Sequence, residues 1–291
     1  MVATANIPSC HLYALDPSRR IKNELLELEI DPSSSEPTEV LTLNKIDGMR
    51  YEGDVGTFIF KHHLDTSFSA DTDINVLDVG SGFGGPSRLL ALKRPKTALV
   101  ALEYIPEISN LAQALTQRCP EVADRVTHVT GDVTQLNDDI LGTCDQFHAA
   151  QGVLSLLHIP DLQTALNKIC DRLIVGGVIY IEDFWLENVL TLEAQSYLME
   201  RVGCPRMPLS EEEWTDCLHQ AGFDRVTFQD VTSSWQPWIH RRAEEYGKSM
   251  DRHERVHGKQ CAKLMLEFYQ TMDSLFTQDL KGCRILAVKS K

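Results

Sequence analysis

The sequence predicts an α/β protein in which helices cover both faces of a mostly parallel β-sheet. From residue 74 onward, short apolar runs typical of buried strands alternate with segments of helical spacing and composition. Such an alternation indicates consecutive βαβ units, whose strands are parallel because each helix returns the chain to the same edge of the sheet. With 291 residues, the chain is long enough for one large domain or two small ones.

The predicted elements follow one another in a regular order. The first strand is expected at residues 74–79, followed by a glycine-rich loop and a helix at 86–93. Further strands are expected at 98–102, 126–129, 146–150 and 178–181, with helices at 105–118 and 162–173. Near the end, residues 225–231 and 283–289 have strand character, and the segment between them is rich in helix-forming Glu, Arg, Lys, Leu and Met. Because no short crossover joins these two strands, they need not be parallel.

The first 40 residues differ from the rest of the chain. Residues 24–30 have weak helical character, and the Pro/Ser-rich stretch 31–37 interrupts regular structure. We therefore expect an N-terminal arm and linker at 1–40 and one functional domain at 41–291.

Composition narrows the class of partner. The 28 Lys and Arg residues against 42 Asp and Glu residues give a net charge of −14, which repels nucleic acid and anionic lipid and favours a small-molecule partner. The eight cysteines contain no C-x-x-C pair, so no metal site or redox motif is expected. We find no secretory signal and no apolar run long enough to span a membrane, which favours a cytoplasmic location.

The glycine-rich loop carries most of the functional information. Gly80, Gly82 and Gly85 fit the G-x-G-x-x-G pattern of dinucleotide loops, whereas Gly80, Gly82 and Gly84 fit the G-x-G-x-G loop of enzymes that use S-adenosylmethionine (SAM). Asp78 favours SAM, because a carboxylate gains nothing beside a diphosphate but attracts the cationic methionyl end of SAM.

Two further acids follow the next two predicted strands. Glu103 ends the second strand, where its two oxygens can accept hydrogen bonds from both ribose hydroxyls. Asp132 follows the third strand, where it can accept a hydrogen bond from the adenine amino group. The other candidate cofactor contacts lie close to the acids and glycines or at the end of the fourth strand: Ser81, Tyr104, Val133 and Gln151.

With these residues, the segment 76–231 resembles the class I SAM-dependent methyltransferases. The resemblance implies SAM as the cofactor and a Rossmann-like, seven-stranded sheet with an antiparallel last strand, to which 226–231 and 283–289 would contribute the two final strands. Acceptor choice would then fall to segments laid over the carboxyl ends of the strands. Three such lid segments are available, at 43–68, 182–208 and 235–281.

The first lid segment resembles two groups of N-methyltransferases. Residues 47–53, Asp-Gly-Met-Arg-Tyr-Glu-Gly, are similar to a segment of the phosphoethanolamine methyltransferases and of the sarcosine and dimethylglycine methyltransferases. In the phosphoethanolamine group a tyrosine here pairs with a histidine beyond the fourth strand, and Tyr51 and His158 match these positions. The resemblance implies His158 as the base and Tyr51 as its hydrogen-bonding gate. The glycine loop is also similar to that of sterol and tocopherol methyltransferases, so the loop does not identify the acceptor.

One departure from the phosphoethanolamine pattern favours an unphosphorylated amine or amino acid. That group has a phosphate-contacting tyrosine where this chain has Phe184. Arg206 offers a partner for a carboxylate, and Asp183 offers an anchor for a substrate ammonium. Aromatic rings bind methylated ammonium groups through cation–π attraction, and the rings available for this are Trp185, Trp235 and Trp238.

Plainer interpretations and rival functions stay open at this point. His158 lies among leucines and can be a core histidine, and Tyr51 and the tryptophans around Pro237 can be packing residues. The charged run 240–245 is typical of a solvated helix face, and the histidines at 62–63 and 253–257 lack partners at ligand spacing. The rival functions are C- or O-methylation of a sterol-like or carboxylate acceptor, silent SAM binding in a partner subunit, and NAD-linked oxidoreduction.

Overall fold

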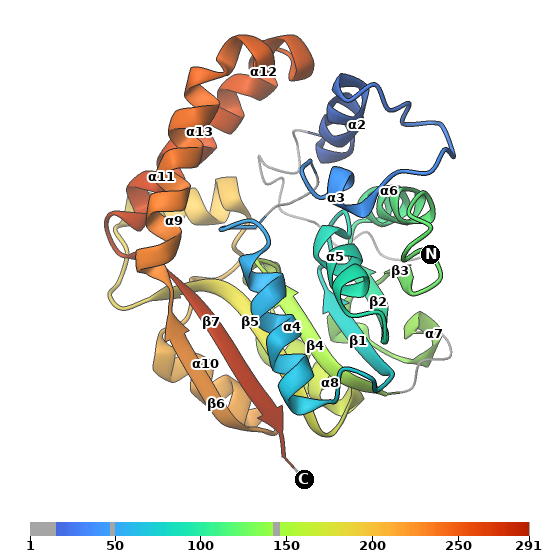
Figure 1. The fold of residues 1–291 in the computed structure, drawn as a ribbon. Helices are drawn as coiled ribbons and strands as arrows, with labels where there is room; N and C mark the ends of the chain where they lie inside the picture. Colours follow the sequence, from blue (N-terminus) through green and yellow to red (C-terminus); the bar gives the residue numbers. More distant parts are fainter. Residues whose placement is uncertain (1–15, 47–49, 142–145, 291) are drawn as a thin grey trace.

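A seven-stranded sheet runs through the computed structural model, which describes residues 16–46, 50–141 and 146–290 (Figure 1). The strand order is β3-β2-β1-β4-β5-β7-β6. Strands β1 to β5 are parallel, whereas β7 is antiparallel to both of its neighbours, β5 and β6. The strands are β1 (Ile74–Val79), β2 (Thr97–Glu103), β3 (Val126–Thr130), β4 (Phe147–Val153), β5 (Leu173–Leu186), β6 (Phe223–Asp230) and β7 (Leu280–Lys289).

Helices cover both faces of this sheet (Figure 1). One face carries α4 (Val55–Ser67), α5 (Gly85–Lys93) and α6 (Pro106–Gln117), and the other carries α7 (Asp138–Leu141), α8 (Leu162–Arg172) and α10 (Glu211–Gln220). The side chains of consecutive strand residues point to opposite faces of the sheet. Val76 packs on the face that carries α4, α5 and α6, and Leu77 packs on the face that carries α7, α8 and α10. This double burial explains the near-continuous apolar runs in the sequence, and it confirms the predicted fold.

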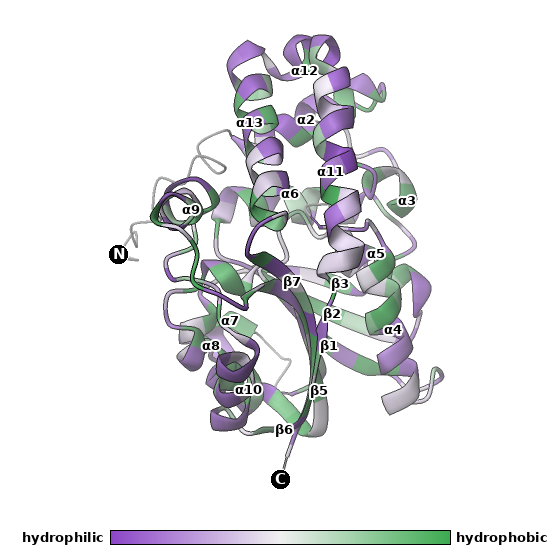
Figure 2. Ribbon diagram, turned by 90° about the vertical axis from the view of Figure 1, so that its left-hand side faces the viewer, coloured by the Kyte–Doolittle hydropathy of each residue, from purple (hydrophilic) through white to green (hydrophobic). Residues whose placement is uncertain are grey.

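A further group of helices stands over the carboxyl ends of the parallel strands. The C-terminal insertion consists of α11 (Thr232–Lys248), α12 (Met250–His257) and α13 (Lys259–Phe276), and α2 (Pro17–Glu27) stands beside its far end (Figures 1 and 2). The short helices α3 (Val40–Leu43) and α9 (Leu192–Tyr197), with the π-helical turn 198–202, complete this layer. Helix α12 buries none of its residues and is largely hydrophilic in Figure 2. Helices α11 to α13 thus occupy most of the segment 235–281, in which the composition predicted helix.

Two of the sequence expectations need correction. The N-terminal helix spans Pro17–Glu27 rather than 24–30, because the Asp16 side chain caps it by accepting a hydrogen bond from the Arg19 amide and Pro17 stands in its first turn. The segment 43–68 is for the most part not a lid. Most of it is α4, whose Phe60 stacks on Tyr180 of the sheet at a centroid distance of 5.2 Å.

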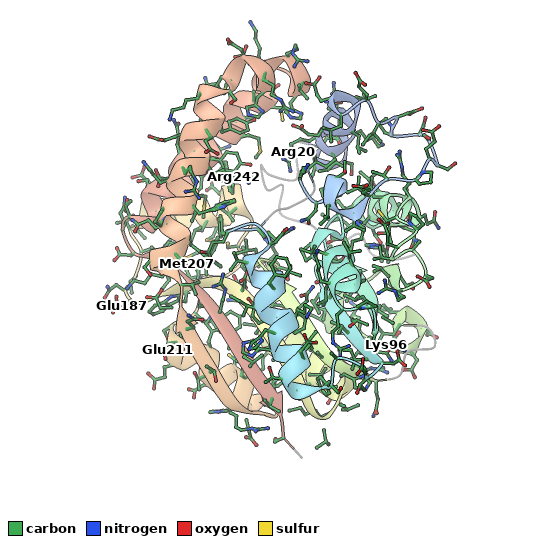
Figure 3. The ribbon with its side chains drawn as sticks, viewed as in Figure 1. Arg20, Lys96, Glu187, Met207, Glu211 and Arg242 are labelled. Atoms are coloured by element: carbon green, nitrogen blue, oxygen red, sulfur yellow. The ribbon has the colours of Figure 1, made fainter. Side chains whose placement is uncertain are left out.

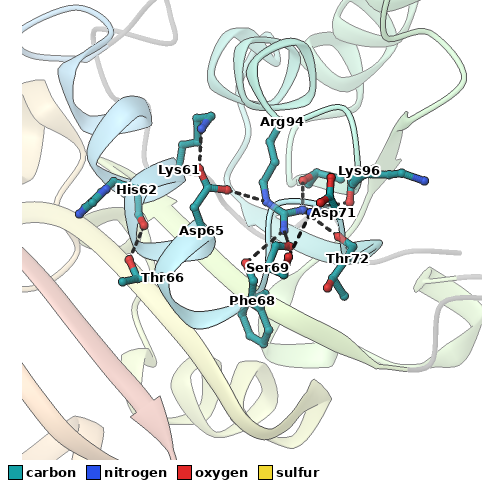
Figure 4. A network of polar contacts seen from close by, with 11 residues as sticks. Lys61, His62, Asp65, Thr66, Phe68, Ser69, Asp71, Thr72, Arg94 and Lys96 are labelled. Carbon is teal, nitrogen blue, oxygen red and sulfur yellow. Dashed lines mark hydrogen bonds and ion pairs between the residues drawn. The ribbon is translucent and has the colours of Figure 1, made fainter.

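A buried arginine fixes the opposite end of the sheet, away from the lid helices (Figure 4). Arg94 donates from Nε to Asp65 Oδ1 at 3.1 Å, which joins the loop after α5 to the end of α4. Its other donors go to the Thr97 hydroxyl and to backbone carbonyls of Phe68, Ser69, Thr72 and Lys96. Because these contacts engage all of its nitrogens, Arg94 serves to order the turns that lead into β1 and β2.

Among the residues that the structure describes, no helix combines the length and the apolar character that crossing a membrane requires.

Candidate active site

A cavity of about 530 Å³ lies at the carboxyl ends of β1, β2 and β4, and residues of α2, α11 and α13 help to line it. Most of the predicted site residues meet there although they come from separate parts of the chain. The predicted residues that line it are Tyr51, Asp78, Gly80, Ser81, Gly82, Glu103, Tyr104, Asp132, Val133 and His158. This convergence follows from the topology, because parallel strands bring their carboxyl ends to one edge.

The glycine loop has the backbone that its sequence predicts. Gly80, Gly82 and Gly84 have φ values of +69°, +55° and +80°, in the left-handed region that glycine tolerates best. A Cβ atom on Gly80 would lie 2.4 Å from Cβ of Ser155, so a side chain has no room there. A Cβ atom on Gly82 would meet nothing within 4 Å, which leaves an open hollow on the cavity side of the loop.

Asp78 lies buried at the end of β1, beside Gln151 in the register of β1 with β4. Its Oδ2 accepts a hydrogen bond of 2.5 Å from the Ser87 hydroxyl. Burial raises the pKa of Asp78 to about 6, although the Ser87 hydrogen bond acts against this shift. A cation bound at the carboxylate would stabilise its ionised form.

Glu103 holds the glycine loop with both of its oxygens. Oε2 accepts a hydrogen bond of 2.9 Å from the Gly82 amide, and Oε1 accepts one of 2.9 Å from the Ile105 amide. Burial raises its pKa, and these amides oppose the shift. A carboxylate has four lone pairs on its two oxygens, so Glu103 keeps acceptor capacity for a ligand hydroxyl.

Asp132 caps the short 3-10 turn Val133–Gln135. Its Oδ1 accepts hydrogen bonds of 2.8 Å from both the amide and the hydroxyl of Thr134. The side chain is thereby fixed at the cavity wall, with Oδ2 left for an additional donor.

Two buried polar atoms in the cavity wall are available to a ligand. Ser81 Oγ and Arg50 Nη1 have no hydrogen-bond partner among the described residues, and buried donors without a partner are rare in proteins. The rest of the Arg50 guanidinium is fixed by Asn44 and Asp54, each at 2.5 Å. With the acids above, these groups complement SAM: anions for its ammonium, ribose and adenine amino groups, and a cation for its carboxylate. The residues present therefore fit this cofactor.

His158 is half-buried at the end of the 3-10 turn Leu156–His158 and faces the cavity. Its Nδ1 lies 3.0 Å from the carbonyl oxygen of Gly203. Since a carbonyl only accepts, Nδ1 carries the proton and the neutral ring has its lone pair on Nε2. Burial lowers the pKa of His158, so the neutral form predominates at neutral pH.

Tyr51 belongs to a group of aromatic rings at the cavity wall. Its ring centroid lies 4.9 Å from that of Trp235, 5.7 Å from that of Trp238 and 6.2 Å from that of Phe184. Burial raises the pKa of the Tyr51 phenol well above its usual range, so the phenol stays protonated. Trp238 and Phe184 also line the cavity.

Seven predicted site residues do not line the cavity. Gly84 and Gly85 begin α5, and Gln151 is buried within the sheet. Trp235 is fully buried beneath Tyr51. The other three, Asp183, Trp185 and Arg206, lie behind the wall of the cavity.

Strand alternation accounts for two of these three residues. Because side chains alternate along β5, Phe184 lies in the cavity wall while Trp185 packs edge-on against Phe228, 5.3 Å away, on the other face. Asp183 accepts a hydrogen bond of 2.7 Å from the Phe184 amide, and its burial raises its pKa to about 7. Arg206 instead donates to the backbone carbonyls of Leu156, Ile159 and Met207.

Three arginines that line the cavity were missed from the sequence: Arg20, Arg50 and Arg242. Figure 3 shows Arg20 on α2 and Arg242 on α11 beside the space between these helices. The run 240–245 is a solvated face except at Arg242, which is half-buried, and Ala243, which is buried. A signal was available, because Trp235, Trp238 and Arg242 have the spacing of one helix face.

Within the part of the chain that the structure describes, one group of possible metal ligands comes together. Glu24 of α2 joins His253 and His257 of α12, with ligand atoms within 4.8 Å of one another, a proximity that the sequence could not reveal. Arg252 already engages both oxygens of Glu24, at 2.6 Å and 3.1 Å. A cation would have to displace this guanidinium, so we assign the group a structural role.

Comparison with known proteins defines the class. A family model described as a methyltransferase domain matches residues 70–222, more than half of the chain, and the chain belongs to this family. It is a SAM-dependent methyltransferase. No curated protein sequence matches it significantly.

Solved structures share the fold at low sequence identity. Phosphoethanolamine N-methyltransferase 2 of Haemonchus contortus, in complex with phosphomonomethylethanolamine and S-adenosylhomocysteine, matches with a TM-score of 0.72 and 16% identity, over 84% of this chain and 55% of that one. This chain thus spans little more than half of that protein. A protein from Galdieria sulphuraria, assigned as a sarcosine dimethylglycine methyltransferase, matches with a TM-score of 0.71 and 16% identity over 96% and 98% of the two chains. The cyclopropane synthase MmaA2 of Mycobacterium tuberculosis matches with a TM-score of 0.71 and 11% identity over 99% and 100%.

Proposed function

We propose that this enzyme transfers a methyl group from SAM to the nitrogen of a small amine or amino acid, with His158 as the base. The observation that carries this proposal is the position of His158. It lines the same cavity as the glycine loop, and its hydrogen bond to Gly203 directs the lone pair of the neutral ring to Nε2. An amine that is protonated at neutral pH must lose that proton before its lone pair can attack, and such a nitrogen base accepts it at neutral pH.

The cofactor has a place for each of its polar groups in this proposal. Asp78 binds the ammonium and Arg50 Nη1 the carboxylate of the methionyl end, while Glu103 accepts from the ribose hydroxyls and Asp132 from the adenine amino group. When bound, SAM supplies a methyl group already activated by its sulfonium. The protein therefore contributes mainly by holding the nucleophile in line with that methyl group.

The aromatic rings at the cavity wall suit an amine that becomes more methylated. Tyr51, Trp238 and Phe184 line the cavity, and aromatic faces attract ammonium groups through cation–π interactions. The Tyr51 phenol is protonated and can donate a hydrogen bond, in accord with a gating role. Asp183, Trp185, Arg206 and Trp235 have no place in the first contact shell of this proposal, because none of them lines the cavity.

A second candidate is methylation of carbon in a lipid-like acceptor. The apolar side chains of Leu157, Val202, Met265 and Phe268 in the cavity favour it. The match with a cyclopropane synthase over the full length of both chains adds support. Because His158 can accept a proton and Tyr51 can donate a hydrogen bond in the cavity, we rank N-methylation above C-methylation.

Labelled SAM distinguishes the two candidates. We expect label on one of a panel of small amines (glycine, N-methylglycine, ethanolamine and phosphoethanolamine) and none on vesicles of unsaturated phospholipid. His158→Ala should lower turnover roughly 100-fold at pH 7.5. Because burial lowers the pKa of His158, the acidic limb of the wild-type pH–rate profile should fall below pH 6.5.

The exposed His62 of α4 supplies the control, since His62→Ala should change neither turnover nor its pH profile. Calorimetric binding of S-adenosylhomocysteine to each variant verifies that the cofactor site is intact. Label on the phospholipid alone would select the second candidate, and full turnover of His158→Ala between pH 6 and 9 would exclude this base.

A further inference from the structure

We infer that the methyl acceptor carries an anionic group, a carboxylate or a phosphate, and that Arg242 of α11 binds this group together with Arg20 of α2. The inference deepens the proposed function and rests on it in placing the acceptor in the cavity beside His158. It assigns to Arg242 the role that the sequence suggested for Arg206.

Arg242 is a cation held between two aromatic rings at the cavity wall. Its guanidinium carbon lies 5.1 Å from the ring centroid of Trp238 and 5.0 Å from that of Tyr269. Nη2 donates a hydrogen bond of 3.1 Å to the Tyr269 hydroxyl. The stacking fixes the plane of the guanidinium while its remaining N–H groups can still bind an anion in a forked geometry.

No carboxylate among the described residues lies within ion-pair distance of Arg242. Other arginines of this protein do have such partners: Arg50 pairs with Asp54, Arg252 with Glu24, Arg255 with Glu27, and Arg284 with both Glu52 and Glu182. Arg118 and Arg206 also lack an acidic partner, but backbone carbonyls accept hydrogen bonds from their guanidinium groups. Among the described residues Arg242 has only the Tyr269 hydroxyl as a hydrogen-bond partner, in a chain whose net charge is −14. Its cost in desolvation is offset when an anionic ligand binds.

The same end of the cavity carries a second positive charge. Arg20 lines the cavity from α2 (Figure 3). Burial raises the pKa of the Tyr269 phenol, but Arg242 and Arg20 outweigh burial and hold this pKa below its usual value. The two arginines therefore create a positive potential where the lid helices meet.

The position of Arg242 indicates a small acceptor. Trp238 contacts both Arg242 and Tyr51, with its ring 5.7 Å from the Tyr51 ring. The anionic group thus lies about one aromatic ring away from Tyr51, in the cavity that His158 also lines. The nucleophile and the anionic group are then only a few bonds apart, as in an amino acid or a phosphorylated amino alcohol.

Matched probes test the charge directly. With the enzyme saturated with S-adenosylhomocysteine, calorimetry compares N-methylglycine with its neutral primary amide, and phosphoethanolamine with ethanolamine. We expect the anionic member of at least one pair to bind about 10- to 100-fold more tightly, as a charge-assisted hydrogen bond requires. The pair that shows the preference distinguishes carboxylate from phosphate.

Variants of Arg242, of its neighbour Arg241 and of Arg20 assign this preference to a residue. Arg242→Gln should abolish it, Arg242→Lys should retain part of it, and the exposed neighbour Arg241 supplies the control Arg241→Gln, which should keep it in full. If Arg242→Gln unfolds, Arg20→Gln provides a second test of the anion site. It should weaken binding of the anionic probe and leave binding of the neutral probe unchanged. Affinity for S-adenosylhomocysteine should be the same in all four variants.

The outcomes separate this inference from the proposed function. Equal or unmeasurable binding of both members of each pair, or a preference that survives Arg242→Gln, overturns the anion site. If anionic probes bind through Arg242 but no nitrogen is methylated, the anion site stands and N-methylation falls. A base-labile methyl ester on the probe would identify the anion itself as the nucleophile, again with the anion site intact.

Discussion

Asp78 shows how a single residue links cofactor binding to pH. Burial raises its pKa to about 6, whereas a cationic methionyl group beside it would favour the ionised form. Affinity for S-adenosylhomocysteine should therefore rise as the pH increases through 6 and level off above pH 7.

Calorimetry between pH 5 and 8 measures this dependence. At pH 6, binding should release a fraction of a proton from Asp78, so the measured heat of binding should vary with the ionisation enthalpy of the buffer. Asp78→Asn should bind weakly at every pH without this proton release. The control Asp161→Asn changes an exposed cap at the rim of the cavity and should keep the wild-type profile. A wild-type affinity that is constant over this range would contradict our placement of the ammonium.

Single residues also show where sequence reasoning fails. Asp78, Glu103 and Asp132 are recognisable because each lies at or just after the carboxyl end of a strand, and the topology brings strand ends together. Arg206 and Arg242 are chemically alike in the sequence, yet Arg206 is engaged by carbonyls and Arg242 lines the cavity. Their roles differ only because their side chains point to different surroundings in the folded protein.

At the scale of elements, α2 is fixed to the C-terminal insertion by a cluster of ion pairs. Glu24 binds Arg252 through two hydrogen bonds, and Glu27 binds Arg255 through two more at 2.8 Å each. Asn23 adds a hydrogen bond of 2.8 Å to the Val256 carbonyl. The same helix α2 contributes Pro17 and Arg20 to the cavity, so this cluster holds one wall of the site in place.

Removing the acids of this cluster should loosen α2 selectively. In the double variant Glu24→Gln, Glu27→Gln we expect faster amide hydrogen exchange in α2 and α12 with unchanged exchange in β1 and β4. Global stability should fall only slightly, because solvent screens these exposed pairs. Glu244→Gln, which breaks a pair inside α11 with Lys248, is the matched control. Unchanged exchange in α2 would show that apolar contacts hold this helix.

At the scale of the whole molecule, one buried charge network connects the sheet to the site. Glu182 on β5 accepts hydrogen bonds from Arg284 Nε at 2.6 Å and from the Tyr180 hydroxyl at 2.7 Å. Arg284 on β7 also donates to Glu52 at 2.5 Å, and Glu52 precedes α4 next to Tyr51. The antiparallel strand β7 thereby fixes the segment that carries the gating tyrosine.

Breaking this network should destabilise the fold. Arg284→Met leaves Glu182 as an unpaired buried charge and should lower the free energy of unfolding by about 3–5 kcal/mol. Adding Glu182→Gln should recover part of this loss, because the unpaired charge is gone. Urea denaturation measures both effects. The control is Lys281→Ala, on the same strand as Arg284, which breaks a more exposed ion pair with Glu187 and should lower the free energy of unfolding by less than about 1 kcal/mol. An equal loss of stability in Arg284→Met and Lys281→Ala would contradict the importance of the network.

The sequence by itself determined the order of strands and helices, the glycine loop and the acids at successive strand ends. It could do so because these features depend on neighbours within a few residues and on the rule that parallel strands end at one edge. The tertiary structure alone decided which distant side chains face the cavity: it brought α2 to α12, left Asp183 and Arg206 behind the wall, and turned Arg242 inward. Such placements depend on how elements far apart in the chain pack together, and local patterns do not encode that packing.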